Sequence, residues 1–227
     1  MATRGEVSPT TRGEAVTIPA GDARLAADVL LPDGAVGAVL FAHGSGSSRH
    51  SPRNTAVAGV LHGRALGTVL VDLLTGEEDR VDARTAELRF DIGLLANRLA
   101  AIVDWMGTEP TLGRLPVGLF GASTGAAAAL VAAAARPDRV RAVVSRGGRP
   151  DLAGPALSEV RAPTLLLVGG LDEQVIALNE QAMADLGEVG ELRVVPGATH
   201  LFEEPGTLEQ VADAAAGWFA DHLPPRR

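Results

Sequence analysis

Residues 117–130 read VGLFGASTGAAAAL and contain the pattern Gly-x-Ser-x-Gly at Gly121–Gly125. The apolar run Val117–Phe120 comes directly before the pattern, and an alanine-rich segment follows it. This order predicts a strand, a tight turn with Ser123 at its apex, and a helix that is buried all round. Such a turn holds the hydroxyl clear at a helix N-terminus, where free N–H groups favour a developing oxyanion. We therefore interpret Ser123 as a candidate nucleophile, and the alternative is a flexible turn in a glycine-rich chain.

Short apolar runs recur along the chain and predict the other strands. They are Ala38–Phe41, Thr68–Val71, Pro116–Phe120, Val140–Val144, Thr164–Val168 and Leu192–Val195. Runs that are apolar at every position are typical of parallel strands covered on both faces. Two further strands, Ala15–Ile18 and Arg24–Leu31, are predicted on either side of a turn at Ala20-Gly21-Asp22.

Segments with helical periodicity separate these runs. The strongest is an amphipathic pattern formed by Leu88, Ile92, Leu95, Leu99, Ile102, Val103 and Met106. Other helices are expected around Val57–Leu61, after Ser123, over Glu173–Leu186 and through Leu208–Phe219. Alternation of strands and helices predicts the α/β class, with a doubly wound, mostly parallel sheet and helices on both faces.

Length and composition are those of one globular domain. The chain has 227 residues, of which 46% are hydrophobic and 21% charged. We expect a flexible tail over residues 1–14 and a single domain over residues 15–227. The sequence has no cysteine, which excludes disulfides, thiolate metal sites and a cysteine nucleophile. It also has no lysine, which excludes chemistry that needs a lysine amine.

The charge and the hydropathy pattern argue against several classes of partner. The formal net charge is −8, so no basic footprint for nucleic acid or for an anionic membrane is visible. The longest apolar run, Ala126–Ala135, is well short of the ~20 residues that span a bilayer. Residues Met1–Gly21 contain no apolar segment typical of a secretory signal. We expect a cytoplasmic protein that acts without nucleic acid or membrane.

A serine hydroxyl needs a base to take its proton, and the chain offers five histidines. His200 follows the run Leu192–Val195 through a short loop, so it is expected at the carboxyl edge of the sheet, where parallel sheets place their ligands. The other four are in helical segments or in loops without an evident partner; they are His43, His50, His62 and His222. His200 is therefore the candidate base.

An acid that orients this histidine is expected in an earlier loop. Asp172 follows the run Thr164–Val168 and precedes the strand of His200. A carboxylate there can orient the imidazole and stabilise its protonated form. Two alternatives remain: Asp172 can instead be a helix N-cap before Glu173, and Asp151 is a rival acid that lies farther past the end of its own strand.

The loop His43–Gly46, with the sequence HGSG, follows the run Ala38–Phe41. Stabilising an oxyanion needs two backbone N–H donors aimed at one point. Thr124, beside the candidate nucleophile, supplies one N–H, and Ser45 in this loop can supply the second. The alternative is a glycine-rich turn that carries a packed histidine.

Two arginines follow the run Val140–Val144 in the segment Ser145–Arg149, which reads SRGGR. Guanidinium groups bind carboxylates and phosphates in a bidentate manner. We expect that Arg146 or Arg149, more favourably Arg146, helps to bind an anionic ester. The alternative is that both arginines pair with acidic neighbours, such as Asp151 or Glu173, and only anchor the loop.

Together these motifs resemble the α/β-hydrolase superfamily over about Val16–Leu223. The resemblance is carried by HGSG at 43–46, GASTG at 121–125, GGLDEQV at 169–175 and GATH at 197–200. The chain is most similar to the small dienelactone-hydrolase-like branch. One departure is plain, since dienelactone hydrolases use a cysteine nucleophile and this chain has Ser123 at that position.

The resemblance implies a Ser123–His200–Asp172 triad, with the main chain of Ser45 and Thr124 as the oxyanion hole. It implies hydrolysis of an ester, thioester or lactone of a small soluble substrate through an acyl-enzyme, without a metal or an organic cofactor. Hydrolases with a cap domain usually carry it between the strands that here flank residues 145–163, and this segment is too short for one. We therefore expect an open site. The alternative is a non-catalytic module of the same fold that binds a ligand or regulates a partner.

Overall fold

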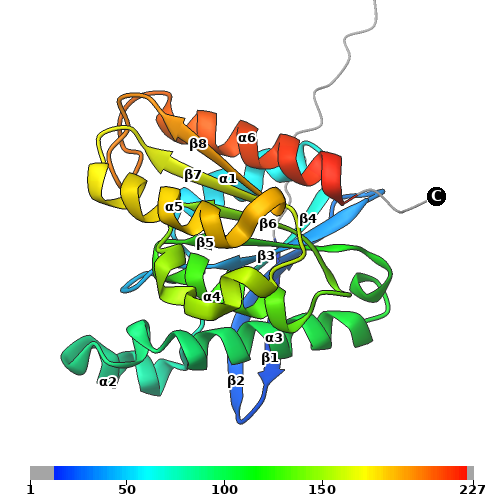
Figure 1. Cartoon of the computed structure of the whole chain (residues 1–227). Coiled ribbons are helices and arrows are strands. Elements are labelled where there is room, and N and C mark those ends of the chain that lie inside the picture. Colours follow the sequence, from blue (N-terminus) through cyan, green and yellow to red (C-terminus); the bar gives the residue numbers. More distant parts are fainter. Residues whose placement is uncertain (1–12, 224–227) are drawn as a thin grey trace, which may run out of the picture.

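The computed structural model describes residues 13–223, which form one eight-stranded sheet with helices on both faces (Figure 1). The strand order is β1-β2-β4-β3-β5-β6-β7-β8. Strands β3 to β8 run parallel to one another, whereas β2 pairs antiparallel with both β1 and β4. The predicted class, a doubly wound and mostly parallel α/β sheet, is confirmed.

Each predicted strand is present, with ends that shift by a few residues. The strands are β1 (Glu14–Ala20), β2 (Ala23–Leu30), β3 (Gly37–Ala42), β4 (Leu66–Val71), β5 (Val117–Ala122), β6 (Val140–Arg146), β7 (Thr164–Gly169) and β8 (Gly190–Val195). The α-helices are α1 (Pro52–His62), α2 (Gly76–Thr85), α3 (Ile92–Thr108), α4 (Thr124–Ala135), α5 (Glu173–Leu186) and α6 (Thr207–His222). Short 3₁₀ segments are η1 (Leu88–Phe90), η2 (Leu112–Arg114), η3 (Pro150–Glu159) and η4 (Gly187–Val189).

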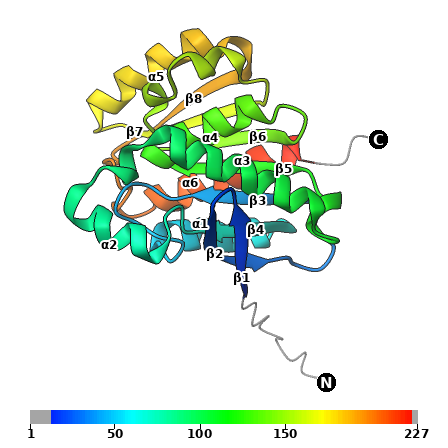
Figure 2. The same cartoon turned by 90° about the horizontal axis from the view of Figure 1, so that it is seen from below.

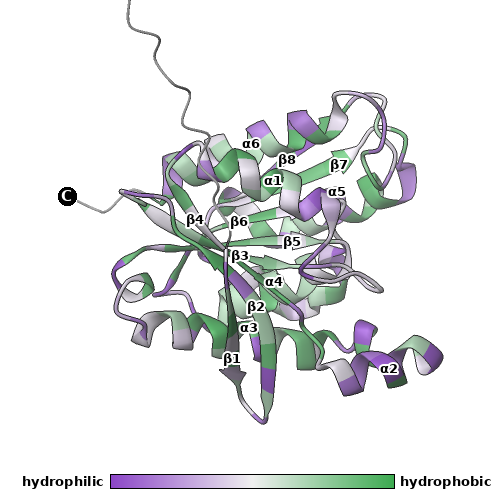
Figure 3. Ribbon diagram, turned by 180° about the vertical axis from the view of Figure 1, so that it is seen from behind, coloured by the Kyte–Doolittle hydropathy of each residue, from purple (hydrophilic) through white to green (hydrophobic). Residues whose placement is uncertain are grey.

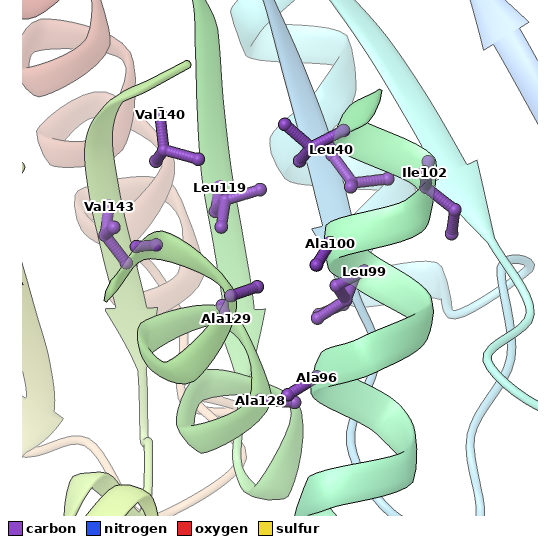
Figure 4. Close-up of a cluster of buried hydrophobic side chains, with 14 of the residues drawn as sticks. Leu40, Ala96, Leu99, Ala100, Ile102, Leu119, Ala128, Ala129, Val140 and Val143 are labelled. Atoms are coloured by element: carbon purple, nitrogen blue, oxygen red, sulfur yellow. The ribbon is translucent and has the colours of Figure 1, made fainter. Parts of the chain in front are cut away.

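Two hydrophobic clusters lie on the two faces of the sheet. Helices α1 and α6 cover one face, and α3, α4 and α5 cover the other (Figure 2). The helix after Ser123, α4, is buried nearly all round, as expected. Its alanines let it pack tightly between the sheet and α3, where Ala128 and Ala129 lie near Leu119 of β5 and Ala96 of α3 (Figure 4). Small side chains thus allow α4, which follows Ser123, to pack closely on both the sheet and α3.

The expected long helix that begins at Leu88 is wrong at its N-terminal end. Residues Leu88–Phe90 form the separate 3₁₀ segment η1, and α3 begins at Ile92. The side chain of Asp91 ends the irregular segment because it accepts a hydrogen bond from the Leu94 N–H, at 2.9 Å, and so caps α3. A local N-cap outweighed the apolar periodicity.

Helix α2 and η1 form a polar excursion between β4 and α3 that periodicity did not predict. The helix carries almost no apolar surface and is one of the most hydrophilic segments of the ribbon (Figure 3). It begins with a capping box in which Thr75 and Glu78 bond each other's backbone N–H groups. Arg98 of α3 attaches the excursion through its ion pair with Glu78, at 2.6 Å, and Arg89 of η1 pairs with Asp82 of α2 within the excursion, at 2.5 Å.

We expect Glu78→Gln to lower the free energy of unfolding at pH 7 by about 2 kcal/mol, because Arg98 is almost fully buried and would lose its charged partner. This value lies between those typical of exposed and of buried ion pairs. Hydrogen bonds from Arg98 lower the pKa of Glu78 to about 2. The ionised Glu78 therefore contributes fully to the free energy of unfolding above its ordinary pKa, near 4.5, and this contribution is lost as the pH falls toward 2. Urea unfolding at several pH values measures it, with Glu77→Gln as the matched control in the same turn. A difference that persists unchanged at low pH would contradict the assignment.

The predicted tail, residues 1–14, lies mostly outside the described residues, and its last residue, Glu14, already belongs to β1. The segment 145–163 holds only the end of β6, the loop after it and the 3₁₀ segment η3, which packs on α4 and α5. Among the helices of residues 13–223, none has both the length and the apolar character that crossing a membrane requires.

Candidate active site

Five neighbouring strands, β3, β5, β6, β7 and β8, bring the candidate residues to one edge of the sheet. Ser123 follows β5, Arg146 ends β6, and Asp172 and His200 follow β7 and β8. The loop that contains Ser45 follows β3. Because parallel strands end at the same edge, residues far apart in the sequence meet there (Figure 1).

Ser123 occupies a strained turn between β5 and α4. Its backbone has φ 50° and ψ −122°, a region that residues other than glycine rarely adopt. A Cβ on Gly121 would lie 2.4 Å from the Ala126 Cα, and a Cβ on Gly125 would lie 2.4 Å from the Ala42 carbonyl oxygen. Both positions therefore need glycine. The turn has the geometry that the Gly-x-Ser-x-Gly pattern predicts.

His200 lies against Asp172, with 2.6 Å between the imidazole Nδ1 and the carboxylate Oδ2. Asp172 stands at the N-terminus of α5, but its side chain makes no capping hydrogen bond. The rival acid, Asp151, instead forms a two-bonded ion pair with Arg149. The structure thus brings Asp172, and not Asp151, to His200. With Nδ1 so engaged, Nε2 is the ring nitrogen left for a reacting group.

Ser123 and His200 line the same small cavity, of about 220 Å³. Gly44 and Ser45 line it as well and also line a larger neighbouring cavity, of about 450 Å³, which reaches Thr124 and the polar excursion. The two cavities therefore meet at the loop after β3. The site is a divided cleft, with the candidate base in the smaller part.

The loop after β3 is anchored by His43. Its Nδ1–H donates to the Gly44 carbonyl, at 2.9 Å, and its Nε2 accepts the N–H of Leu73, at 3.1 Å. This pattern requires the neutral imidazole, and burial lowers the pKa of His43 accordingly. His43 is thus a packed histidine that orients the loop, as the alternative interpretation of this motif holds, and both of its nitrogens are occupied.

Two backbone N–H groups are available for an oxyanion. Thr124 is the first residue of α4, so its N–H has no partner within the helix. Within residues 13–223, neither the Thr124 N–H nor the Ser45 N–H donates to a protein acceptor. Ser45 and Thr124 both line the larger cavity. This is where the sequence predicts the oxyanion hole.

The remaining histidines are placed differently. His62 bonds the Thr68 hydroxyl and His222 bonds the Trp218 carbonyl, both at 2.8 Å. His50 is exposed at the rim of the larger cavity, where its ring lies 3.7 Å from the Asp28 carboxylate. In the part of the chain that the structure describes, no three His, Cys, Asp or Glu side chains gather as a metal site would require.

The structure places the two candidate arginines in different surroundings. Arg149 is engaged by Asp151 and does not line either part of the cleft, so the structure does not support a substrate role for it. Arg146 is buried and lines the small cavity with Ser123. Arg53 of α1 lines that cavity too. Sequence reasoning missed Arg53 because it lies in α1, outside every motif, and no local signal shows that its side chain faces the cavity.

The sequence profile of the dienelactone hydrolase family matches residues 69–222, which is more than half of the chain. The chain belongs to the dienelactone hydrolase family. Membership in this family supports hydrolase activity. The resemblance inferred from the motifs is thereby confirmed.

Two family relatives come from Mycobacterium tuberculosis, strains CDC 1551 / Oshkosh and ATCC 25618 / H37Rv. Each is 58% identical to this chain over 215 residues, which is 95% of this chain and 48% of the relative. This family member therefore spans about half the length of the curated relatives that it matches. The names of those relatives propose a phosphoribosyl transferase.

Solved structures give the same picture of the fold. A dienelactone hydrolase from Anabaena variabilis ATCC 29413 is 56% identical and superposes with a TM-score of 0.92, covering 94% of this chain and 99% of that chain. The esterase Pf2001 from Pyrococcus furiosus is only 16% identical, with a TM-score of 0.74 and coverage of 97% and 98%. The second similarity shows the fold alone.

Proposed function

We propose that this member of the dienelactone hydrolase family is a serine hydrolase that cleaves a carboxylic ester, or a related thioester or lactone, of a small soluble substrate. One arrangement carries the proposal. Ser123 stands at a strained strand-to-helix turn and shares a cavity with His200, which in turn is bonded to Asp172. This is the nucleophile, base and acid arrangement of acyl transfer.

In the proposed mechanism, His200 Nε2 takes the Ser123 proton as Oγ attacks the acyl carbon. The N–H groups of Ser45 and Thr124 stabilise the oxyanion of the tetrahedral intermediate. The protonated His200 then gives its proton to the leaving oxygen, and the acyl group stays on Ser123. Water, deprotonated by the same histidine, attacks the acyl-enzyme and releases the acid.

The transferase name of the Mycobacterium tuberculosis relatives points to another reaction. Because this chain covers only 48% of their length, we assign the transferase activity that the name implies to the half of those relatives that this chain does not match. The matched half corresponds to the hydrolase fold, which supports hydrolysis for this chain. The alternative is a non-catalytic module that uses the cleft only for binding. A cytoplasmic location remains a prediction of the sequence.

A panel of p-nitrophenyl esters from acetate to dodecanoate tests the proposal. We expect hydrolysis with the highest kcat/KM for short acyl groups, because segment 145–163 holds no cap domain and the larger cavity, about 450 Å³, has a polar lining of serines and aspartates. A serine-directed phosphonate should label Ser123 and abolish activity. Absence of both hydrolysis and labelling would favour the non-catalytic module. Preference for chains of twelve carbons, or activation at a lipid interface, would contradict the open polar site.

A further inference from the structure

Arg146 is a buried cation without a counter-ion. Its relative exposure is 8%, and its Nη1 is buried without a hydrogen-bond partner. Within residues 13–223, no carboxylate forms an ion pair with it. The other buried arginine of the described chain, Arg98, does have such a partner, because it pairs with Glu78 at 2.6 Å.

A second guanidinium strengthens the positive potential at the same place. Arg53 lines the small cavity with Arg146, and its Nε is also buried without a partner. Its only carboxylate contact in the described chain is Glu203, at 3.3 Å, and that side chain is 63% exposed. Burial, together with the charge of Arg53, lowers the pKa of Arg146 to about 10. A buried cation with a second cation beside it is costly unless an anion joins them.

The position of the pair identifies the part of the substrate that carries this anion. In acyl transfer, the protonated histidine must reach the leaving oxygen, so the leaving group departs on the side of His200. His200, Arg53 and Arg146 line the small cavity together. The larger cavity is lined by both oxyanion donors, Ser45 and Thr124, but not by His200, so we assign it to the acyl group.

We propose that Arg146 and Arg53 form an anion subsite for a carboxylate or phosphate group on the alcohol part of the substrate. The inference rests on the proposed function and names the substrate class: a neutral, small acyl group esterified to an anionic alcohol. Hydrolysis consumes one water and releases the acid from the acyl side and the still charged alcohol from the subsite. Arg146 supplies the buried contact, and Arg53 supplies the one nearer to solvent.

Three acetate esters with the same aryl skeleton test the subsite. They are 4-acetoxybenzoate, 4-acetoxyphenyl phosphate and the neutral 4-acetoxybenzamide. We expect kcat/KM for one or both anionic esters to exceed that for the amide by at least ~10-fold, which is the effect of a partly desolvated charged contact. Comparing the two anions separates a carboxylate from a phosphate subsite. Phenyl hydrogen adipate, with its charge on the acyl side, should show no such advantage over neutral phenyl hexanoate.

The variants Arg146→Gln and Arg53→Gln remove one charge each, and Arg149→Gln is the matched control. For each protein we take the ratio of kcat/KM for an anionic ester to kcat/KM for the neutral ester. Comparing this ratio between variant and wild type cancels the intrinsic reactivity of the esters. We expect Arg146→Gln to lower this ratio at least ~10-fold and Arg53→Gln to lower it less. Arg149→Gln should leave the ratio unchanged. Arg53→Gln, at a partly exposed position, keeps the test valid if Arg146→Gln does not fold.

Binding can be measured apart from catalysis, so the subsite and the proposed function can fail separately. In Ser123→Ala, calorimetry with phenyl phosphate and with 4-hydroxybenzoate should show binding of at least one, weakened in the added Arg146→Gln background. Binding without any ester hydrolysis by wild type would support the subsite and overturn the proposed function. Equal losses for anionic and neutral esters, an advantage confined to the acyl-side anion, or no anion binding at all would overturn the subsite.

Discussion

Ser123→Ala is expected to lower kcat for every ester that the protein hydrolyses by at least ~10³-fold, because loss of a triad member typically costs that much or more. The substitution removes only Oγ and keeps the Cβ, so the strained turn gains no new contact. KM should change little, since the cavities and the backbone donors remain. Pre-steady-state kinetics with an excess of p-nitrophenyl ester should also lose the burst of p-nitrophenolate that reports formation of the acyl-enzyme.

The control for this substitution is Ser158→Ala on η3. That hydroxyl only donates to the Pro155 carbonyl, on the exposed surface. Its removal should leave kcat unchanged, and circular dichroism with thermal unfolding should show both variants folded. Activity that survives in Ser123→Ala would refute the nucleophile assignment, and this outcome does not depend on the anion subsite.

The second large effect is expected for Asp172→Asn, which should lower kcat at least ~10³-fold while the protein stays folded. The carboxylate now accepts the Nδ1–H of His200 at 2.6 Å. The side-chain amide of the variant can instead donate its NH₂ to Nδ1, which leaves the ring proton on Nε2. A protonated Nε2 cannot take the proton of Ser123. Replacement by asparagine thus keeps the size of the side chain and changes only the tautomer and the charge.

Asp151→Asn is the matched comparison because Asp151 follows the preceding strand and is the rival acid. Its carboxylate is committed to Arg149, so the substitution should lower the free energy of unfolding by at most ~1 kcal/mol. Its kcat should stay within about threefold of wild type, because neither side chain of this pair lines the cleft. Equal or reversed losses in kcat would transfer the acid role to Asp151.

The sheet was predictable from the sequence because its signal is local. A parallel strand covered on both faces is apolar along most of its length, and β3, β5 and β7 are buried throughout. The turn at Ser123 was predictable for a related reason. Its glycines are required by contacts with the neighbouring turn and with β3, so a five-residue pattern reports a three-dimensional constraint.

The polar excursion shows where local patterns mislead. Helix α2 has no apolar stripe, so periodicity could not reveal it, and the capping box at Thr75 and Glu78 was the only signal in the sequence. Leu88 continued the apolar spacing of α3 but lies outside it, because the Asp91 cap begins the helix at Ile92. Hydrogen bonding by one side chain decided what hydrophobic spacing alone did not.

The sequence by itself determined the sheet, the strained turn and the order of the candidate groups, since each depends on neighbours along the chain. Only the tertiary structure decided the partners of the charged groups. Arg146 and Arg149 are three residues apart in the sequence, yet Asp151 pairs with Arg149, while the buried Arg146 lines the small cavity with Arg53 of α1. Charges act through space over distances set by the fold, and their cost depends on burial, which no local pattern encodes.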